Sequence, residues 1–190
     1  MAKVFDGIDE RLAAWIAAQR LFFVATAPST SGHVNVSPKG PIDTLSVVGR
    51  DRVAYLDRIG SGAETAAHLR DDGRITIMIC AFEGPPRIVR LHGRGSFVAA
   101  GDAGFAQRLA DTGLERVDLP EVRRAVVDVA VERVSDSCGY GVPLMAFEAH
   151  RPQTEAWART KLRKEGPEAL QRYVDAKNAR SIDDLPAFDG

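Results

Sequence analysis

The sequence predicts a mainly β protein of the α+β class: a closed or half-closed antiparallel β-barrel with short flanking helices and a helical C-terminal tail. Short runs of β-branched and aromatic residues, separated by turn signals, fill the first three-quarters of the chain. No alternation of strands and helices continues far enough to indicate a doubly wound sheet. After Pro152 the residues become charged and typical of helices.

The expected strands are short, and most are bounded by turn residues. Gly49-Arg50-Asp51 is a turn signal between two of them, and Glu83-Gly84-Pro85-Pro86 joins the two longer ones. One strand alternates until it reaches Pro38-Lys39-Gly40, which cannot continue as a central strand. The predicted strands are residues 21–27, 33–37, 44–48, 52–57, 75–82, 87–98 and 126–134.

Helical patterning marks the N-terminus, two interruptions of the strands, and the tail. Leu12, Trp15 and Ile16 follow i, i+3, i+4 spacing, and Asp9 favours a helix start. The predicted helices are residues 9–19, 62–70, 103–111, 154–164 and 167–178.

The chain is expected to form a barrel domain over residues 1–150 and a helical extension over residues 151–190. Trp157, Leu162, Leu170 and Tyr173 are the apolar side chains that would dock this extension on the barrel or on a partner subunit. We expect residues 181–190 to be extended or poorly ordered.

The composition is that of a soluble globular protein, with 190 residues, 45% hydrophobic content, 27% charged content and a net charge of −1. Because the basic residues are dispersed, nothing indicates nucleic-acid binding. No stretch approaches a membrane span and no secretory signal is recognisable, so we expect a cytoplasmic protein without membrane association. The two cysteines and four histidines lack metal-ligand spacing, so no metal site is expected.

The strand end at residues 37–40 is the first candidate for binding chemistry. It places the Ser37 hydroxyl, a mobile cation at Lys39 and the permissive backbone of Gly40 together. Such a strand end suits an anionic or planar cofactor better than it suits a core.

A second candidate is the glycine-rich segment at residues 60–65. Ser61 and Glu64 have capping-box spacing, which predicts a helix starting near Gly62. A helix start binds phosphate through free N–H groups, and Thr65 and the preceding Arg58 would assist. The alternative is an ordinary capped helix after a turn.

Two further segments carry candidate residues. On the strand over residues 87–98, Arg90, His92 and Arg94 share one face. This face either meets a cofactor through Arg90 or His92, or is simply solvated. Tyr140 lies between two glycines on an expected exposed turn, where its ring either covers a flat ligand or is an ordinary loop residue.

In the order of these segments, the chain over residues 10–150 resembles the pyridoxamine 5′-phosphate oxidase-like, FMN-binding split-barrel superfamily of flavin and deazaflavin oxidoreductases. The segments that carry the resemblance are Asn35-Val36-Ser37-Pro38-Lys39-Gly40, Tyr55-Leu56-Asp57 with the following residues 60–65, Phe82-Glu83-Gly84-Pro85-Pro86, Arg90-Leu91-His92-Gly93-Arg94-Gly95, and Ser137-Cys138-Gly139-Tyr140-Gly141.

The resemblance implies an antiparallel split β-barrel that forms a homodimer with two flavin sites at its interface. It places residues 36–39 beside the flavin ring and ribityl chain, and Ser61 and Thr65 at the phosphate with Lys39 or Arg58. The complete set of candidate cofactor-binding residues is Asn35, Val36, Ser37, Pro38, Lys39, Arg58, Ser61, Thr65, Arg90, His92 and Tyr140.

The leading functional hypothesis is therefore an FMN-dependent oxidoreductase that acts on a small-molecule substrate. The chain departs from the vitamin-converting oxidases, because Ala63-Glu64-Thr65 stands where they carry Ser-Arg-Lys. Two alternatives on the same barrel remain. One is a haem- or tetrapyrrole-binding protein with His68 or His92 as axial ligand. The other is a reductase that uses a deazaflavin (coenzyme F420). No catalytic acid or base stands out.

Overall fold

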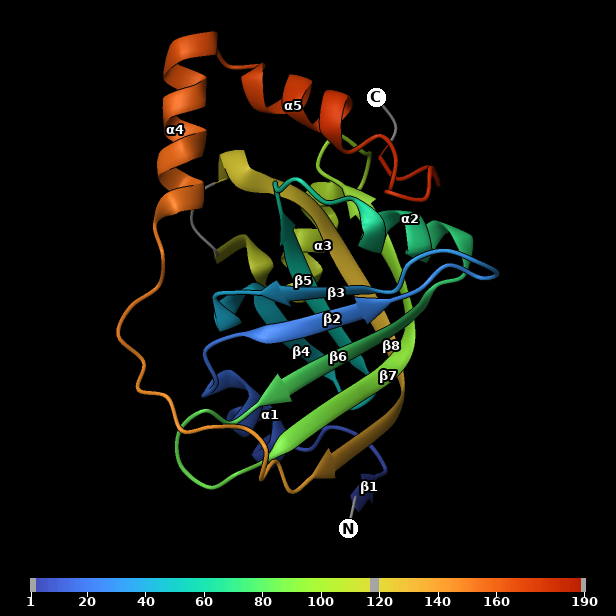
Figure 1. Cartoon of the computed structure of the whole chain (residues 1–190), viewed down its shortest axis with the longest axis vertical. Coiled ribbons are helices and arrows are strands. Elements are labelled where there is room, and N and C mark those ends of the chain that lie inside the picture. Colours follow the sequence, from blue (N-terminus) through green and yellow to red (C-terminus); the bar gives the residue numbers. More distant parts are fainter. Residues whose placement is uncertain (1–2, 117–119, 189–190) are drawn as a thin grey trace.

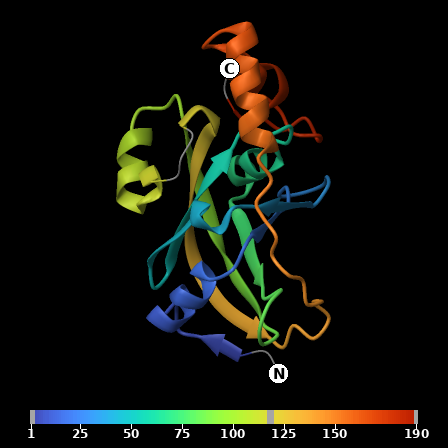
Figure 2. The same cartoon turned by 90° about the vertical axis from the view of Figure 1, so that its left-hand side faces the viewer.

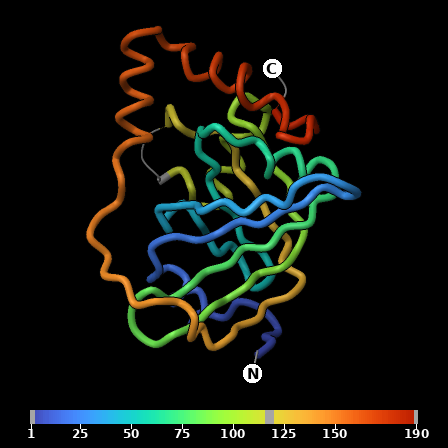
Figure 3. Tube along the Cα trace, in the orientation of Figure 1, coloured from blue at the N-terminus to red at the C-terminus, as the bar shows by residue number. Residues whose placement is uncertain are grey.

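The structure is a computed structural model that describes residues 3–116 and 120–188. Its centre is an antiparallel sheet of eight strands that curls into a barrel (Figures 1 and 3). The strands are β1 (Lys3–Phe5), β2 (Phe22–Thr26), β3 (Asn35–Lys39), β4 (Leu45–Gly49), β5 (Arg52–Arg58), β6 (Arg74–Cys80), β7 (Ile88–Ala99) and β8 (Arg123–Ser137). The predicted mainly β class and barrel are confirmed.

The sheet has two unpaired ends, and these ends create the split in the barrel. Its order is β3-β2-β6-β7-β8-β5-β4, with β1 added beside β8. Within the described residues, β3 pairs only with β2 and β4 pairs only with β5. The strands at the two ends of the order therefore face each other without backbone hydrogen bonds between them.

Five α-helices flank the described part of the barrel: α1 (Glu10–Ala17), α2 (Glu64–Asp71), α3 (Phe105–Thr112), α4 (Gln153–Glu165) and α5 (Ala169–Lys177). Figure 2 shows α3 on one side of the sheet and the extended chain that leads to α4 on the other. None of the described helices is long and apolar enough to cross a membrane.

The core has two main parts. The larger fills the barrel, with Phe22, Ile77 and Leu91 completely buried. The second lies beneath α4 and α5, where Leu170 and Val174 pack against Ile59 and Ala125. The tail thus docks on the barrel through residues of the predicted apolar set, whereas the boundary at residue 150 stays a prediction.

Most predicted elements are present within a few residues of their expected bounds. Asp9 caps α1, because its carboxylate accepts a hydrogen bond of 2.7 Å from the Leu12 backbone N–H. The predicted turn after residue 48 is also present, with Gly49 paired to Arg52. β1 was not predicted, since three residues carry too little pattern.

The prediction that the strand ends before Pro38 is wrong. β3 continues through Pro38 and Lys39, which pair with Phe23 and Phe22. Proline has no N–H to donate, but β3 is an edge strand and needs donors on one side only. The proline correctly indicated that this is not a central strand. It did not exclude an edge strand, which is what β3 is.

The prediction of a capping box at Ser61 is also wrong. α2 begins at Glu64 after Ala63, and no side chain caps its N-terminus. A Cβ on Gly62 would lie 2.6 Å from Glu64 Oε2, so the glutamate side chain folds back over this glycine.

For the end of the chain, predicted to be extended or poorly ordered, the second alternative is wrong for residues 181–188, and residues 189–190 lie outside the described part. Arg180 forms a β-bridge with Pro186. Phe188 is buried and packs against Phe97 with ring centroids 5.2 Å apart. The buried Phe188 ring therefore fixes the end of the chain against the barrel, although the sequence of residues 181–188 is polar and irregular.

Candidate functional site

Alternation along β3 divides the predicted binding residues between two faces of the sheet. Ser37 pairs with the completely buried Val24, so Asn35, Ser37 and Lys39 face the inside of the barrel. Val36 and Pro38 therefore face outward, and Val36 is 62% exposed. We call these two sides the inner face and the outer face.

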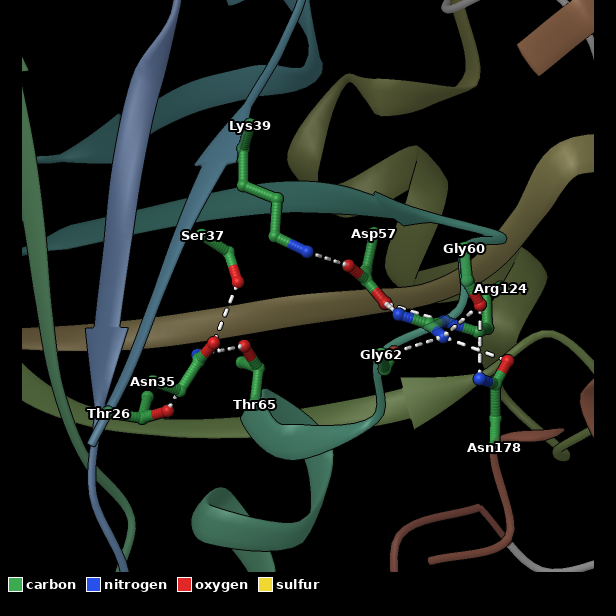
Figure 4. A network of polar contacts seen from close by, with 10 residues as sticks. All are labelled: Thr26, Asn35, Ser37, Lys39, Asp57, Gly60, Gly62, Thr65, Arg124 and Asn178. Carbon is green, nitrogen blue, oxygen red and sulfur yellow. Dashed lines mark hydrogen bonds and ion pairs between the residues drawn. The ribbon is translucent and has the colours of Figure 1, made fainter. Parts of the chain in front are cut away.

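On the inner face, the Asn35 side chain joins three elements. Its amide N–H groups donate to the hydroxyls of Thr26 on β2 and Thr65 on α2, both at 3.1 Å. Its carbonyl oxygen accepts from Ser37 at 2.7 Å. The close-up in Figure 4 shows these contacts side by side between β3 and α2. Asn35 thereby fixes the start of α2 against the edge strand.

A completely buried histidine lies behind this cluster. His68 Nδ1 is 3.0 Å from the Thr26 hydroxyl oxygen. Burial lowers the pKa of His68, although the carboxylates Asp183, Glu64 and Asp71 oppose this effect. Burial therefore favours the neutral form of the imidazole beside Thr26.

Beside the cluster, the buried Asp57 carboxylate holds two cations. Lys39 Nζ lies 2.7 Å from one oxygen, and Arg124 Nε donates to the other at 2.8 Å. Burial favours the protonated acid, but the two cations outweigh it and lower the pKa of Asp57. Lys39 reaches from β3 to β5 across the split of the barrel, so it is a fixed cation and not the mobile one predicted.

Arg124 extends this ionic group to the C-terminal tail. Its guanidinium donates to the Gly62 carbonyl at 2.8 Å and to the Asn178 side chain at 2.9 Å. The Asn178 amide in turn donates to the Gly60 carbonyl at 3.0 Å. The loop before α2 is thus held by a β8 arginine and a tail asparagine (Figure 4).

Sequence reasoning missed Arg124 and Asn178 as parts of the site. Arg124 lies 67 residues from Asp57, and Asn178 lies 118 residues from Gly60. The one local signal for Arg124 is that it is a charged residue at the start of an otherwise apolar strand. No local signal identified Asn178.

The predicted phosphate residues are brought near α2, with different exposures. Thr65 is buried and accepts the hydrogen bond from Asn35, whereas Ser61 is exposed on the loop. Arg58, at the end of β5, forms an ion pair with Glu155 of α4. Thr65 and Lys39 therefore share the inner face, while Arg58 is directed to the tail.

Two further candidates, Arg90 and His92, lie on the outer face. His92 pairs with Thr76 and Arg90 pairs with Met78, in register with the outward residues of β2. His92 Nδ1 is 3.1 Å from the Thr76 hydroxyl, and burial together with nearby arginines lowers the pKa of His92. An open groove of about 370 Å³ adjoins His92.

A β-bulge sets the position of His92. The register between β7 and β8 shifts between His92 and Gly93. A Cβ on Gly93 would lie 2.0 Å from the Ala130 carbonyl oxygen, so only glycine allows this close approach. The bulge therefore depends on Gly93 and presents the neighbouring histidine at the groove.

The predicted exposed turn at Tyr140 is confirmed. Gly139 has a φ of 67°, and the Tyr140 side chain is 82% exposed. The extended chain that follows carries Leu144 and Met145, which are 80% and 57% exposed. This segment climbs along the outside of the barrel to α4 (Figure 1).

No metal site is evident in residues 3–116 and 120–188, where no group of three potential ligands converges. Of the two proposed haem ligands, His68 is enclosed behind Thr26, whereas His92 adjoins the open groove.

The fold, a barrel open at one edge with a polar inner face beside that opening, defines a split-barrel protein. Residues 8–138 match the family model described as pyridoxamine 5′-phosphate oxidase. The chain is also 37% identical, over 197 aligned positions, to the pyridoxamine 5′-phosphate oxidase family protein ustO of Aspergillus flavus, covering 97% of this chain and 77% of that protein. The chain therefore belongs to the pyridoxamine 5′-phosphate oxidase family.

A solved structure agrees with the fold. HupZ of Group A Streptococcus superposes with a TM-score of 0.51 at 22% identity, covering 67% of this chain and 91% of HupZ. At this identity the likeness concerns the fold alone. The family match ends at residue 138, so Asn178 and the rest of the tail lie outside it.

Proposed function

We propose that the protein is a flavin-binding oxidoreductase, with FMN as the flavin that its family resemblance implies and a small molecule as substrate. The observation that carries the proposal is the inner face at the split of the barrel. There Lys39, Asn35, Ser37 and Thr65 bring one cation, an amide and two hydroxyls together beside the unpaired edge of β3.

These groups fit the uncharged parts of a flavin. Amides and hydroxyls donate to and accept from the ring carbonyls and ribityl hydroxyls, and each hydroxyl here keeps hydrogen-bonding capacity beyond its contact with Asn35. Bound flavin would supply the electron transfer. The chain's own residues would bind and orient it, and the neutral Asn35 cluster would position Thr65 and Ser37 for that task.

We also propose that the protein acts as a homodimer. Arg90 and His92 lie on the opposite face of the sheet from Lys39 and Ser37, so one chain does not present both sets to one ligand. Two-fold pairing lets the outer face of one copy meet the inner-face opening of the other. The exposed Val34, Val36 and Leu144 provide apolar area for such an interface.

The test combines an absorption spectrum of the purified protein with equilibrium titration by FMN. A Lys39→Met and Thr65→Val double variant is expected to weaken FMN binding at least about tenfold, because two polar contacts are lost. Lys164→Met, an exposed cation on α4, is the matched control and should bind like the wild type. If the double variant binds FMN as tightly as the wild type and is folded by circular dichroism, the site assignment is wrong.

Haem binding is the second candidate, favoured by the position of His92 beside the open groove. Addition of haem would then give a Soret band that changes in His92→Ala. A spectrum that the substitution leaves untouched removes His92 as the ligand.

A further inference from the structure

The charged side chains around the loop before α2 bear on whether a flavin phosphate can bind there. Three cations lie there, and each is paired with a carboxylate. Lys39 and Arg124 share Asp57, and Arg58 contacts Glu155. Asp57 and Arg124 are almost completely buried, so these pairs are internal parts of the structure rather than surface contacts.

A third carboxylate lies at the helix start itself. Glu64 is the first residue of α2, and no side chain caps that terminus. Its Oε2 lies so close to Gly62 that a Cβ there would be 2.6 Å away, and its Oε1 lies 3.4 Å from the Ile182 backbone N. The carboxylate therefore occupies the positive end of the helix, where a phosphate would otherwise bind.

These groups are three cations (Lys39, Arg58, Arg124) and three carboxylates (Asp57, Glu64, Glu155), so the six together carry no net charge. A phosphate monoester carries about −1.5 to −2 charges at pH 7. A phosphate at this position would be repelled by the Glu64 carboxylate. It would also compete with Asp57 for Lys39 and Arg124, which Asp57 already holds. The residues present fit the flavin ring and ribityl chain, but not a phosphate at α2.

We propose that Glu64 is a specificity determinant that keeps phosphate away from the start of α2. The protein then binds the flavin through its ring and ribityl chain, with little preference for FMN over riboflavin. This inference rests on the proposed flavin binding and concerns which chemical form of flavin the same site accepts. It also accounts for a glutamate where the vitamin-converting oxidases that the chain resembles carry a cation.

The experiment measures the dissociation constants of riboflavin and FMN by quenching of flavin fluorescence. Wild-type protein is expected to bind the two within about threefold of each other, since the phosphate gains no net attraction. Glu64→Gln is expected to tighten FMN binding by roughly tenfold and to leave riboflavin unchanged, because one negative charge near the phosphate is removed. This gain should shrink as salt is added.

Glu168→Gln is the matched control, because Glu168 is 84% exposed before α5 and far along the chain from the loop. It should leave both dissociation constants at wild-type values. Circular dichroism and the urea midpoint check that Glu64→Gln folds normally.

Two results would overturn the inference while leaving the proposed function intact. One is wild-type binding of FMN more than about tenfold tighter than riboflavin, since a tenfold ratio requires a real phosphate contact. The other is a Glu64→Gln variant with an unchanged FMN-to-riboflavin ratio. If neither flavin binds wild type or variant, the proposed function fails and the inference fails with it.

Discussion

The two faces of β3 differ in how many of their side chains find partners within one chain. On the inner face, Asn35, Ser37 and Lys39 each have a polar partner within the same chain. On the outer face, Val36 is 62% exposed, and the neighbouring Val34 is 70% exposed. This difference between the two faces is the basis of our proposal that a second copy of the chain packs against the outer face.

The inner face also shows what holds the split barrel together. Backbone hydrogen bonds do not join its two ends within the described residues, but the ion pair of Lys39 with Asp57 links the end strand β3 to β5, where Arg124 of β8 joins it. Buried ionic groups of this kind contribute little net stability as a whole, but losing one member is costly because the others stay buried and unpaired.

The largest expected effect is therefore the loss of Arg124. Arg124→Ala leaves Asp57 with one cation and removes the donor to the Gly62 carbonyl and Asn178. We expect the free energy of unfolding to fall by about 3–5 kcal/mol, measured by urea denaturation. Arg172→Ala, which removes an exposed pair with Glu168, should cost less than about 1 kcal/mol. Equal losses of stability in the two variants would show that the buried ionic group of Lys39, Asp57 and Arg124 matters no more for stability than an exposed ion pair.

The next effect concerns the outer face. Val36→Glu places a charge on the surface proposed to meet a second copy, where burying an unpaired charge is unfavourable. We expect the dimer dissociation constant to rise on the order of a hundredfold by sedimentation equilibrium, with the folded monomer retained. Asp43→Asn, which changes an exposed carboxylate outside β3, serves as the control. An unchanged dissociation constant for Val36→Glu would place the interface elsewhere.

The next prediction concerns the dependence of stability on pH. Burial lowers the folded-state pKa of His68, so the unfolded chain binds the proton more tightly. Stability is then greatest above the unfolded value of about 6.5 and is lost as the pH falls from there toward the folded pKa. In His68→Gln, the urea midpoint is expected to change less between pH 7 and pH 5 than it does in the wild type.

The control for this pH experiment is His150→Gln, which replaces an exposed ring outside the cluster. His92 contributes a loss of the same sign, so the slope in His68→Gln should shrink without vanishing. A wild-type slope retained in His68→Gln would mean that the buried imidazole is not the group that titrates.

The smallest expected effect tests the corrected helix start. Because Ser61 is exposed and caps nothing, Ser61→Ala should change the free energy of unfolding by less than about 0.5 kcal/mol. A true N-cap serine would cost about 1 kcal/mol. A loss of that size in Ser61→Ala would restore the capping box predicted from the sequence.

Local patterns predicted the parts of this fold that depend on near neighbours. The spacing of Leu12 and Ile16 identified α1, and alternation placed Arg90 and His92 on one face of β7. Alternation alone does not tell on which side of the barrel that face lies, because this follows from the pairing of the four strands β3, β2, β6 and β7.

The rest depended on contacts that sequence spacing does not encode. Asp57 meets Arg124 and Asn178 meets Gly60 across long separations in the chain. Phe188 is buried against Phe97 although its own surroundings in sequence look irregular. Such pairings follow from topology, so local signals gave no reason to select Arg124 or Asn178.

The most direct test of the central claim is complementation between the two faces. A Lys39→Met and Thr65→Val variant loses the inner face, and an Arg90→Ala and His92→Ala variant loses the outer face. If each flavin site takes one face from each copy, neither variant alone binds FMN well, but mixed dimers contain one intact site. Random mixing should then restore about a quarter of the wild-type sites. Mixed dimers seen by native mass spectrometry without any recovered FMN binding would contradict the account.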